Sequence, residues 1–173
     1  GVIALALHGN APAADWQPVA GKIMTKWGKE LKPGNAWPEY PRPQFERKEW
    51  RNLNGLWDYA VTAKETVKPT EWQGKILVPF AIESALSGVG KMLEPEQALW
   101  YRRTIEAKPD SGKRTLLNFE AVDYQATVWV NGQQVGEHIG GNTPFSFDIT
   151  EALKAGANEL AVRVWDATGG TQL

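Results

Sequence analysis

The chain contains no cysteine and only two histidines, His8 and His138, among its 173 residues. The lack of cysteine excludes disulfide bonds, zinc–thiolate sites and cysteine nucleophiles. Two histidines, one of them close to the N-terminus, cannot supply a multi-histidine metal site. The sequence therefore predicts a protein with no metal and no other cofactor.

The chain also has no excess of positively or negatively charged residues. The formal net charge is −1, and no basic cluster is interleaved with aromatic residues. This balance gives no electrostatic case for nucleic acid or an acidic lipid surface as a partner. The chain also lacks the glycine-rich motifs that cradle phosphates or dinucleotides. The apolar run from Val2 to Leu7 is far too short to span a membrane.

The first 13 residues form a segment of their own, GVIALALHGNAPA. Ala11-Pro12-Ala13 has the small-x-small form of a signal-peptidase site and follows the apolar run. We interpret residues 1–13 as the remnant of a secretory signal and expect an exported protein, periplasmic or extracellular. An ordinary N-terminal arm is the alternative.

Residues 14–52 are rich in proline, tryptophan and charge. Pro38, Pro41 and Pro43 forbid a helix around them, so this segment is predicted to be an irregular extended arm over the surface of a domain. A brief helical turn is expected from Met24 to Leu31. The chain has nine tryptophans. They either fill the core or stack on sugar rings, and composition alone does not decide between the two.

From Asn54 onward, short segments alternate apolar and polar residues, which is typical of half-buried strands. Asn131-Gly132 predicts a type I′ hairpin turn, since both positions tolerate positive φ. Asp148 and Glu151 resemble a capping box for a short helical turn through Leu153. We expect strands at 55–62, 75–80, 99–107, 114–121, 122–130, 133–137, 145–149 and 160–164. The pattern predicts an all-β antiparallel sandwich or jelly roll over residues 53–173.

No self-contained catalytic constellation is visible. A glycosidase needs two carboxyl groups facing each other about 5–10 Å apart. Asn-Glu pairs carry the acid/base group in some glycosidases, but Asn158-Glu159 opens a strand just after a turn, and we favour a solvated turn pair. A triad of His138 with Asp123 or Asp166 and a serine lacks the Gly-x-Ser-x-Gly elbow that would support it.

Four segments, in order, resemble the N-terminal domain of glycoside hydrolase family 2, the β-galactosidase, β-glucuronidase and β-mannosidase group. They span roughly Leu53 to Trp165, and the last is the most specific because it is a long ordered series of matches. The segments are NLNGLWDYAV, ILVPFAIESALSGVG, LWYRRTIE and FEAVDYQATVWVNGQQVGEHIGGNTPFSFDITEALKAGANELAVRVW.

The resemblance implies a jelly-roll sugar-binding domain, which the family follows with an immunoglobulin-like domain and a (β/α)₈ barrel. Both catalytic glutamates lie in that barrel, which needs about 250 residues. No catalytic residue is therefore expected here, and we expect a C-terminally truncated jelly roll without its closing strand. In relatives an aspartate beyond the strand that ends near Trp165 reaches the substrate. Asp166, with Trp165 beside it, is the nearest substrate-binding candidate.

The predicted function is that of an accessory domain in a retaining exo-β-glycosidase, such as a β-galactosidase, with a carbohydrate as partner through the parent enzyme. Two alternatives stay open: an autonomous carbohydrate-binding module, and a β-sandwich that binds proteins.

Overall fold

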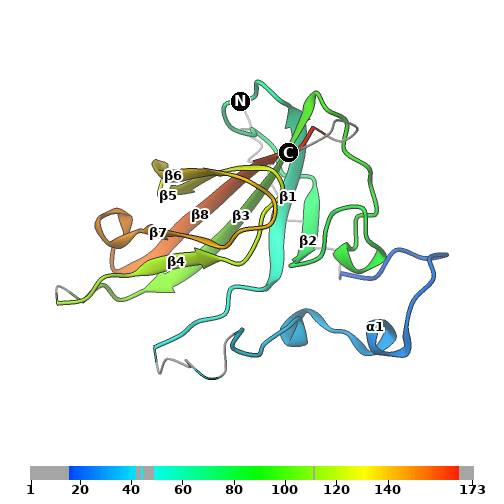
Figure 1. The fold of residues 1–173 in the computed structure, drawn as a ribbon, viewed down its shortest axis with the longest axis horizontal. Helices are drawn as coiled ribbons and strands as arrows, with labels where there is room; N and C mark the ends of the chain where they lie inside the picture. The colour runs from blue at the N-terminus through cyan, green and yellow to red at the C-terminus, as the bar shows by residue number, and fades with distance from the viewer. Residues whose placement is uncertain (1–15, 42–43, 45–48, 111, 168–173) are drawn as a thin grey trace, which may run out of the picture.

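The computed structural model describes residues 16–41, 44, 49–110 and 112–167 (Figure 1). The predicted remnant of a secretory signal, residues 1–13, lies outside the described residues. Within them the chain folds into a six-stranded sheet and a two-stranded sheet, and every strand pair is antiparallel. The predicted all-β antiparallel sandwich is confirmed.

The larger sheet has the strand order β2-β1-β3-β8-β5-β6, and the smaller sheet pairs β4 with β7. The larger sheet consists of β1 (Gly55–Ala63), β2 (Gly74–Val78), β3 (Gln97–Ala107), β5 (Gln125–Val130), β6 (Gln133–Ile139) and β8 (Gly156–Trp165). The smaller sheet consists of β4 (Leu116–Phe119) and β7 (Phe145–Asp148). In Figure 1 the two short strands lie side by side across one face of the larger sheet.

The core lies between the two sheets and follows the period-two alternation of the strands. Val128 and Val130 of β5 point inward and are fully buried. Leu160 of the neighbouring β8 also points inward and is fully buried. Leu117 and Phe147 supply the opposite wall from the smaller sheet. The inward faces predicted for these strands are confirmed.

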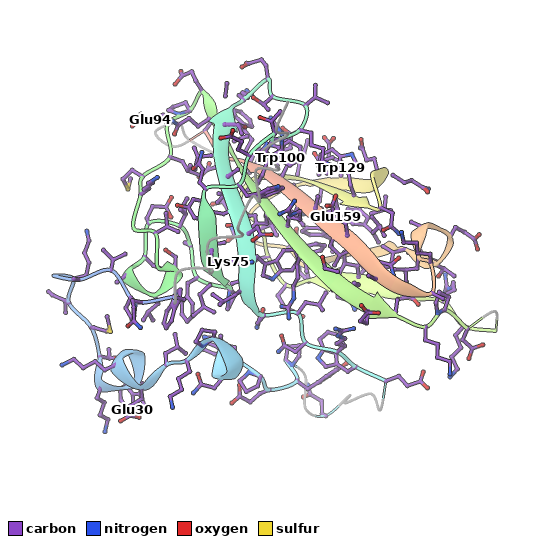
Figure 2. All side chains as sticks on the ribbon, turned by 180° about the vertical axis from the view of Figure 1, so that it is seen from behind. Glu30, Lys75, Glu94, Trp100, Trp129 and Glu159 are labelled. Atoms are coloured by element: carbon purple, nitrogen blue, oxygen red, sulfur yellow. The ribbon has the colours of Figure 1, made fainter. Side chains whose placement is uncertain are left out.

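The other face of the larger sheet carries a second buried layer, built on tryptophan. Trp100 is only 2% exposed and stacks on Trp129 with 5.2 Å between ring centroids (Figure 2). Trp100 and Trp129 therefore pack against each other within the protein. The loop after β1 is also tied to this face, because Arg163 Nη2 donates a hydrogen bond to the Lys64 carbonyl oxygen at 2.5 Å.

The Asn131-Gly132 turn has the predicted geometry, with φ of 52° and 82° at the two positions. The capping box proposed for Asp148 and Glu151 is wrong. The 3₁₀ turn spans Thr150–Ala152, and Asp148 Oδ1 accepts hydrogen bonds from the Thr150 N–H at 3.0 Å and from its hydroxyl at 2.5 Å. The aspartate reaches two residues ahead, as side chains of this type do in local turns.

The expectation of a solvated turn pair at Asn158-Glu159 is wrong for Asn158. This residue lies inside β8, and only 1% of it is exposed. Its side chain is bonded to the turn before β8 and to Asn131. Glu159 points to the outer face and pairs with Lys68 at 3.4 Å.

The N-terminal arm runs beside the sandwich rather than within it (Figure 1). It contains the predicted helical turn as α1 (Lys26–Glu30), followed by a 3₁₀ turn at Pro33–Asn35. Its start is held by a hydrogen bond from the Val19 N–H to the Ala85 carbonyl oxygen at 2.9 Å. Among the described residues, no helix combines the length and apolar character needed to cross a membrane.

Candidate functional site

Both residues predicted to contact a substrate, Trp165 and Asp166, lie at the C-terminal end of β8. The Tyr124 N–H donates to the Trp165 carbonyl oxygen at 3.3 Å, and the Gly140 N–H donates to the Tyr124 carbonyl oxygen at 2.9 Å. These bonds bring the ends of β5, β6 and β8 together. We call the group formed by Asp123, Gly140, Gly141 and Asp166 the acidic corner.

Trp165 is half-buried and already has protein partners. Its indole N–H donates to the Pro95 carbonyl oxygen at 2.7 Å, and Lys64 Nζ lies 3.4 Å from the centre of its ring. This arrangement ties the end of β8 to the loops around Lys64 and Pro95. A sugar contact by Trp165 stays a prediction, and its N–H is engaged within the domain.

The two aspartates of the acidic corner influence each other. Partial burial raises the pKa of the Asp123 carboxyl, and the negative charge of Asp166 raises it further. The oxygens of a carboxyl group accept hydrogen bonds, and sugar hydroxyl groups can donate them. The corner therefore has the chemistry to hold a hydroxylated ligand, although substrate contact by Asp166 stays a prediction.

Gly141 sets the shape of this corner. A Cβ atom at Gly141 would lie 2.3 Å from Asp123 Oδ1, well inside contact distance. The glycine thus leaves room for the Asp123 side chain. The sequence showed a glycine pair there but not which side chain needed the space.

His138 has a structural setting rather than a catalytic one. Its Nε2 lies 3.2 Å from Thr143 Oγ1, and its ring stacks on Phe145 with 4.1 Å between centroids. These contacts give no support to a serine–histidine–aspartate triad. No group of three or more histidine, aspartate or glutamate side chains is placed to hold a metal ion in the described part of the chain.

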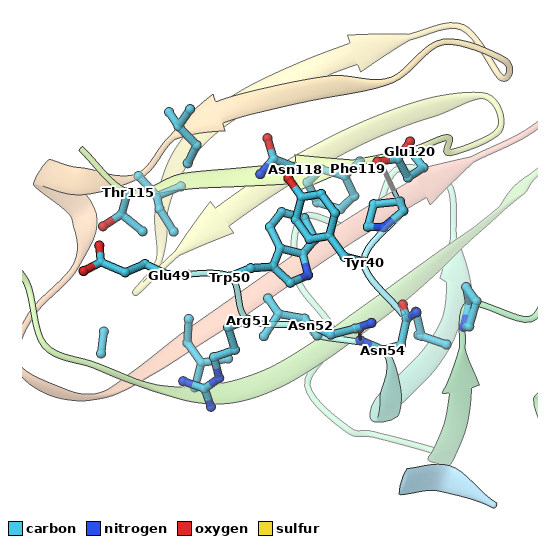
Figure 3. A pocket seen from close by; sticks show the side chains of 18 of the residues that line it. Tyr40, Glu49, Trp50, Arg51, Asn52, Asn54, Thr115, Asn118, Phe119 and Glu120 are labelled. Carbon is cyan, nitrogen blue, oxygen red and sulfur yellow. Dashed lines mark hydrogen bonds between the residues drawn. The ribbon is translucent and has the colours of Figure 1, made fainter. Parts of the chain in front are cut away.

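A cavity that the sequence did not predict lies between the N-terminal arm and β4 (Figure 3). Its volume is about 880 Å³. Tyr40 and Trp50 of the arm line it and meet edge to face, with 4.8 Å between ring centroids. The aromatic residues at either end of EYPRPQFERKEW were the available signal, but only the folded chain shows that they meet.

A comparison with protein families decides the assignment. Residues 76–173 match the family described as "Glycosyl hydrolases family 2, sugar binding domain". The chain belongs to glycosyl hydrolase family 2. The match includes the acidic corner, and it confirms the resemblance read from the strand and turn motifs.

Curated relatives in family 2 are much longer than this chain. The β-glucuronidase of Felis catus is 32% identical over 164 residues, which cover 85% of this chain and 24% of that protein. A β-galactosidase of Thermoanaerobacter pseudethanolicus is 48% identical over 68 residues, covering 38% of this chain and 9% of the relative. The chain thus spans about a quarter, or less, of these relatives.

Solved structures of family 2 enzymes share the fold. The β-glucuronidase of Faecalibacterium prausnitzii superimposes with a TM-score of 0.57 at 30% sequence identity. The superposition covers 74% of this chain and 22% of the enzyme. The described sandwich therefore corresponds to one part of a larger molecule in that relative.

Proposed function

We propose that this chain is the non-catalytic sugar-binding domain of a longer β-glycosidase. The observation that carries the proposal is the family match over residues 76–173, combined with coverage of only 24% of the Felis catus β-glucuronidase. In this role the remainder of the parent enzyme consists of an immunoglobulin-like domain and a (β/α)₈ barrel, and two glutamates of the barrel do the chemistry. The present domain supplies a wall beside the active site.

A β-glucuronidase is the parent that the relatives favour. Proteins of that name from Felis catus, Sus scrofa and Canis lupus familiaris each match 85% of this chain, at 32%, 30% and 29% identity. The β-galactosidase match is stronger per residue but covers 38% of the chain. A β-galactosidase parent, which the sequence motifs alone allowed, therefore has the narrower support.

Within such an enzyme, the acidic corner is the part we propose to approach the substrate. Asp166 follows β8 directly, and its charge already acts on Asp123. Contacts of this kind, made far from the bond that breaks, accelerate a reaction when they are stronger in the transition state than in the ground state. The proposed role is therefore substrate positioning, with no proton transfer assigned to either aspartate.

Titration calorimetry of the 173-residue chain with methyl β-glucuronide, β-galactoside and β-mannoside tests the proposal. We expect affinities weaker than millimolar, because one wall of a pocket offers few convergent contacts. Micromolar affinity would instead identify an autonomous carbohydrate-binding module. In the longer enzyme, Asp166→Asn should raise KM for a nitrophenyl glycoside by about tenfold or more, the loss expected for one polar contact. An unchanged KM would remove Asp166 from the substrate site.

We also propose that the parent protein is exported. The support is the apolar run and the Ala11-Pro12-Ala13 motif in the first 13 residues. Fusing a longer natural N-terminus, including this segment, to a reporter enzyme that is active only after export tests the proposal. Reporter activity supports it when cleavage after Ala13 is also seen and is blocked by changing Ala13 to a large residue, and a cytoplasmic, uncleaved fusion contradicts it.

A further inference from the structure

The turn between β5 and β6 carries a chemically labile pair, Asn131-Gly132. An asparagine followed by glycine is prone to spontaneous deamidation, because glycine has no side chain to shield its backbone nitrogen. Both residues are exposed, and no heavy atom lies within 4 Å of the position that a Cβ atom on Gly132 would take. Steric crowding therefore does not protect this pair.

Deamidation of the pair needs only water as a reactant. The backbone nitrogen of Gly132 bonds to Cγ of Asn131, while the bond from Cγ to Nδ2 breaks. The Nδ2 group leaves as ammonia with the proton that the Gly132 nitrogen loses. Water then opens the five-membered succinimide ring at either carbonyl group, which yields aspartate or isoaspartate. The first step requires the side-chain amide of Asn131 to turn toward Gly132.

The fold restrains this amide by three side-chain hydrogen bonds, which we call the Asn131 clamp. Asn131 Nδ2 donates to the Ala152 carbonyl oxygen and to Asn158 Oδ1, both at 2.8 Å. Asn131 Oδ1 accepts from the Glu159 N–H at 3.1 Å. Both amide hydrogens and the amide oxygen are therefore engaged, and rotation toward Gly132 breaks the clamp.

The Asn158 side chain is a fixed member of the clamp. Only 1% of this residue is exposed, and its Oδ1 also accepts from the Lys154 N–H at 2.8 Å. Its Nδ2 donates to the carbonyl oxygens of Lys154 and Gly156. An amide turned over at Asn158 would place donors against donors and acceptors against acceptors, so its Oδ1 stays directed at Asn131.

The products of deamidation do not fit the clamp. An aspartate at position 131 has no donor, and its carboxylate would face the Ala152 carbonyl oxygen and Asn158 Oδ1, which are both acceptors. Isoaspartate adds a backbone carbon to a two-residue turn whose flanking residues, Val130 and Gln133, are paired with each other. Either product should therefore hinder the hairpin from closing again on β8.

We propose that Asn131-Gly132 is a site of spontaneous modification, which the clamp keeps closed in the folded domain and which opens when the hairpin parts from β8. Local openings of this kind occur in native proteins without global unfolding. Deamidation during an opening makes it irreversible. The rate at Asn131 is thus set by the clamp and not by burial, since the residue is exposed.

The test measures deamidation of the 173-residue chain by peptide mapping and mass spectrometry after incubation in mildly alkaline, heavy-oxygen water. Asn54-Gly55 is the other Asn-Gly pair of the chain and serves as the internal reference. In concentrated urea, where the chain is unfolded, Asn131 and Asn54 should react at similar rates. In the folded chain Asn131 should react at least about tenfold more slowly than in urea.

Two variants separate the clamp from the general stability of the domain. Asn158→Ala removes an acceptor of the clamp, whereas Gly141→Ala crowds Asp123 and leaves the clamp intact. We compare them at urea concentrations that give both the same free energy of unfolding, with both still folded. Asn158→Ala should then react at Asn131 at least about tenfold faster than Gly141→Ala.

A third variant, Asn131→Asp, carries the direct product of deamidation. It should unfold at a clearly lower urea concentration than the wild type, whereas Asn142→Asp, at an exposed position, should not. Equal rates at Asn131 in the folded and unfolded chain would overturn the proposal. Equal rates in Asn158→Ala and Gly141→Ala at matched stability would overturn it too, as would an Asn131→Asp chain as stable as the wild type.

Discussion

The side chains of Asn131 and Asn158 are hydrogen-bonded to each other, with 2.8 Å between Asn131 Nδ2 and Asn158 Oδ1. The contact joins the hairpin turn after β5 to the first half of β8. Asn158 Nδ2 also donates to the carbonyl oxygens of Lys154 and Gly156, both at 2.8 Å. A single buried amide thus fixes the hairpin, the preceding turn and the start of β8.

We expect Asn158→Ala to lower the free energy of unfolding by roughly 2–4 kcal/mol, since it leaves several buried polar groups without partners. Urea unfolding followed by fluorescence measures this change. Asn142→Ala, at an exposed position, is the matched control and should change stability by less than about 0.5 kcal/mol. Equal effects of the two substitutions would contradict the structural role of Asn158.

Asp58 links three elements of the larger sheet and gives a pH prediction. Burial alone would raise the pKa of its carboxyl, but hydrogen bonds from Lys75 and Arg102, together with their charges, lower it overall. A lowered folded-state pKa contributes stability above the unfolded pKa, near 4, and this contribution is lost as the pH falls through the folded value. The stability difference between the wild type and Asp58→Asn should therefore be larger at pH 7 than at pH 2.5. Denaturant midpoints at the two pH values check this, and a constant difference would refute it.

Gly141→Ala should destabilise the acidic corner by about 1–3 kcal/mol, the usual cost of forcing an atom into occupied space. The added Cβ atom would meet Asp123 Oδ1 at 2.3 Å. Asp123→Ala in the same chain should restore most of the loss, because it removes the clashing atom. Gly34→Ala, where no heavy atom lies within 4 Å of the new Cβ, is the control. If Asp123→Ala does not restore the stability lost by Gly141→Ala, the clash is not the cause of that loss.

Trp165→Phe keeps an aromatic ring beneath Lys64 but removes the donor to the Pro95 carbonyl oxygen at 2.7 Å. We expect a loss of about 1 kcal/mol, the typical net value of one hydrogen bond. Thermal unfolding followed by circular dichroism measures it. A loss above about 3 kcal/mol would show that the ring packs more tightly than these two contacts indicate.

Local alternation was enough to predict much of the fold. The inward positions of Val128, Val130 and Leu160 follow from the period of a strand, and Asn131-Gly132 specifies its own turn. Contacts between distant residues could not be predicted in this way. Asn158 looked like a turn residue because its partner Asn131 lies 27 positions away in the sequence.

The site was predicted less completely than the fold. The strand pattern placed Trp165 and Asp166 at the end of β8, since both follow the apolar alternation directly. It did not show that Lys64 and Pro95 engage Trp165, because loop paths depend on tertiary packing. Likewise, the cavity between the N-terminal arm and β4 exists only because these two segments, far apart in the chain, face each other.

Hydrolysis of nitrophenyl β-glucuronide, β-galactoside and β-mannoside by the 173-residue chain alone tests the central claim most directly. We predict no turnover above the uncatalysed rate, and turnover of one of these substrates when the chain is joined to the rest of its parent enzyme. Clear turnover by the isolated chain that disappears when one of its own carboxyl groups, such as Asp123 or Asp166, is replaced would contradict the account.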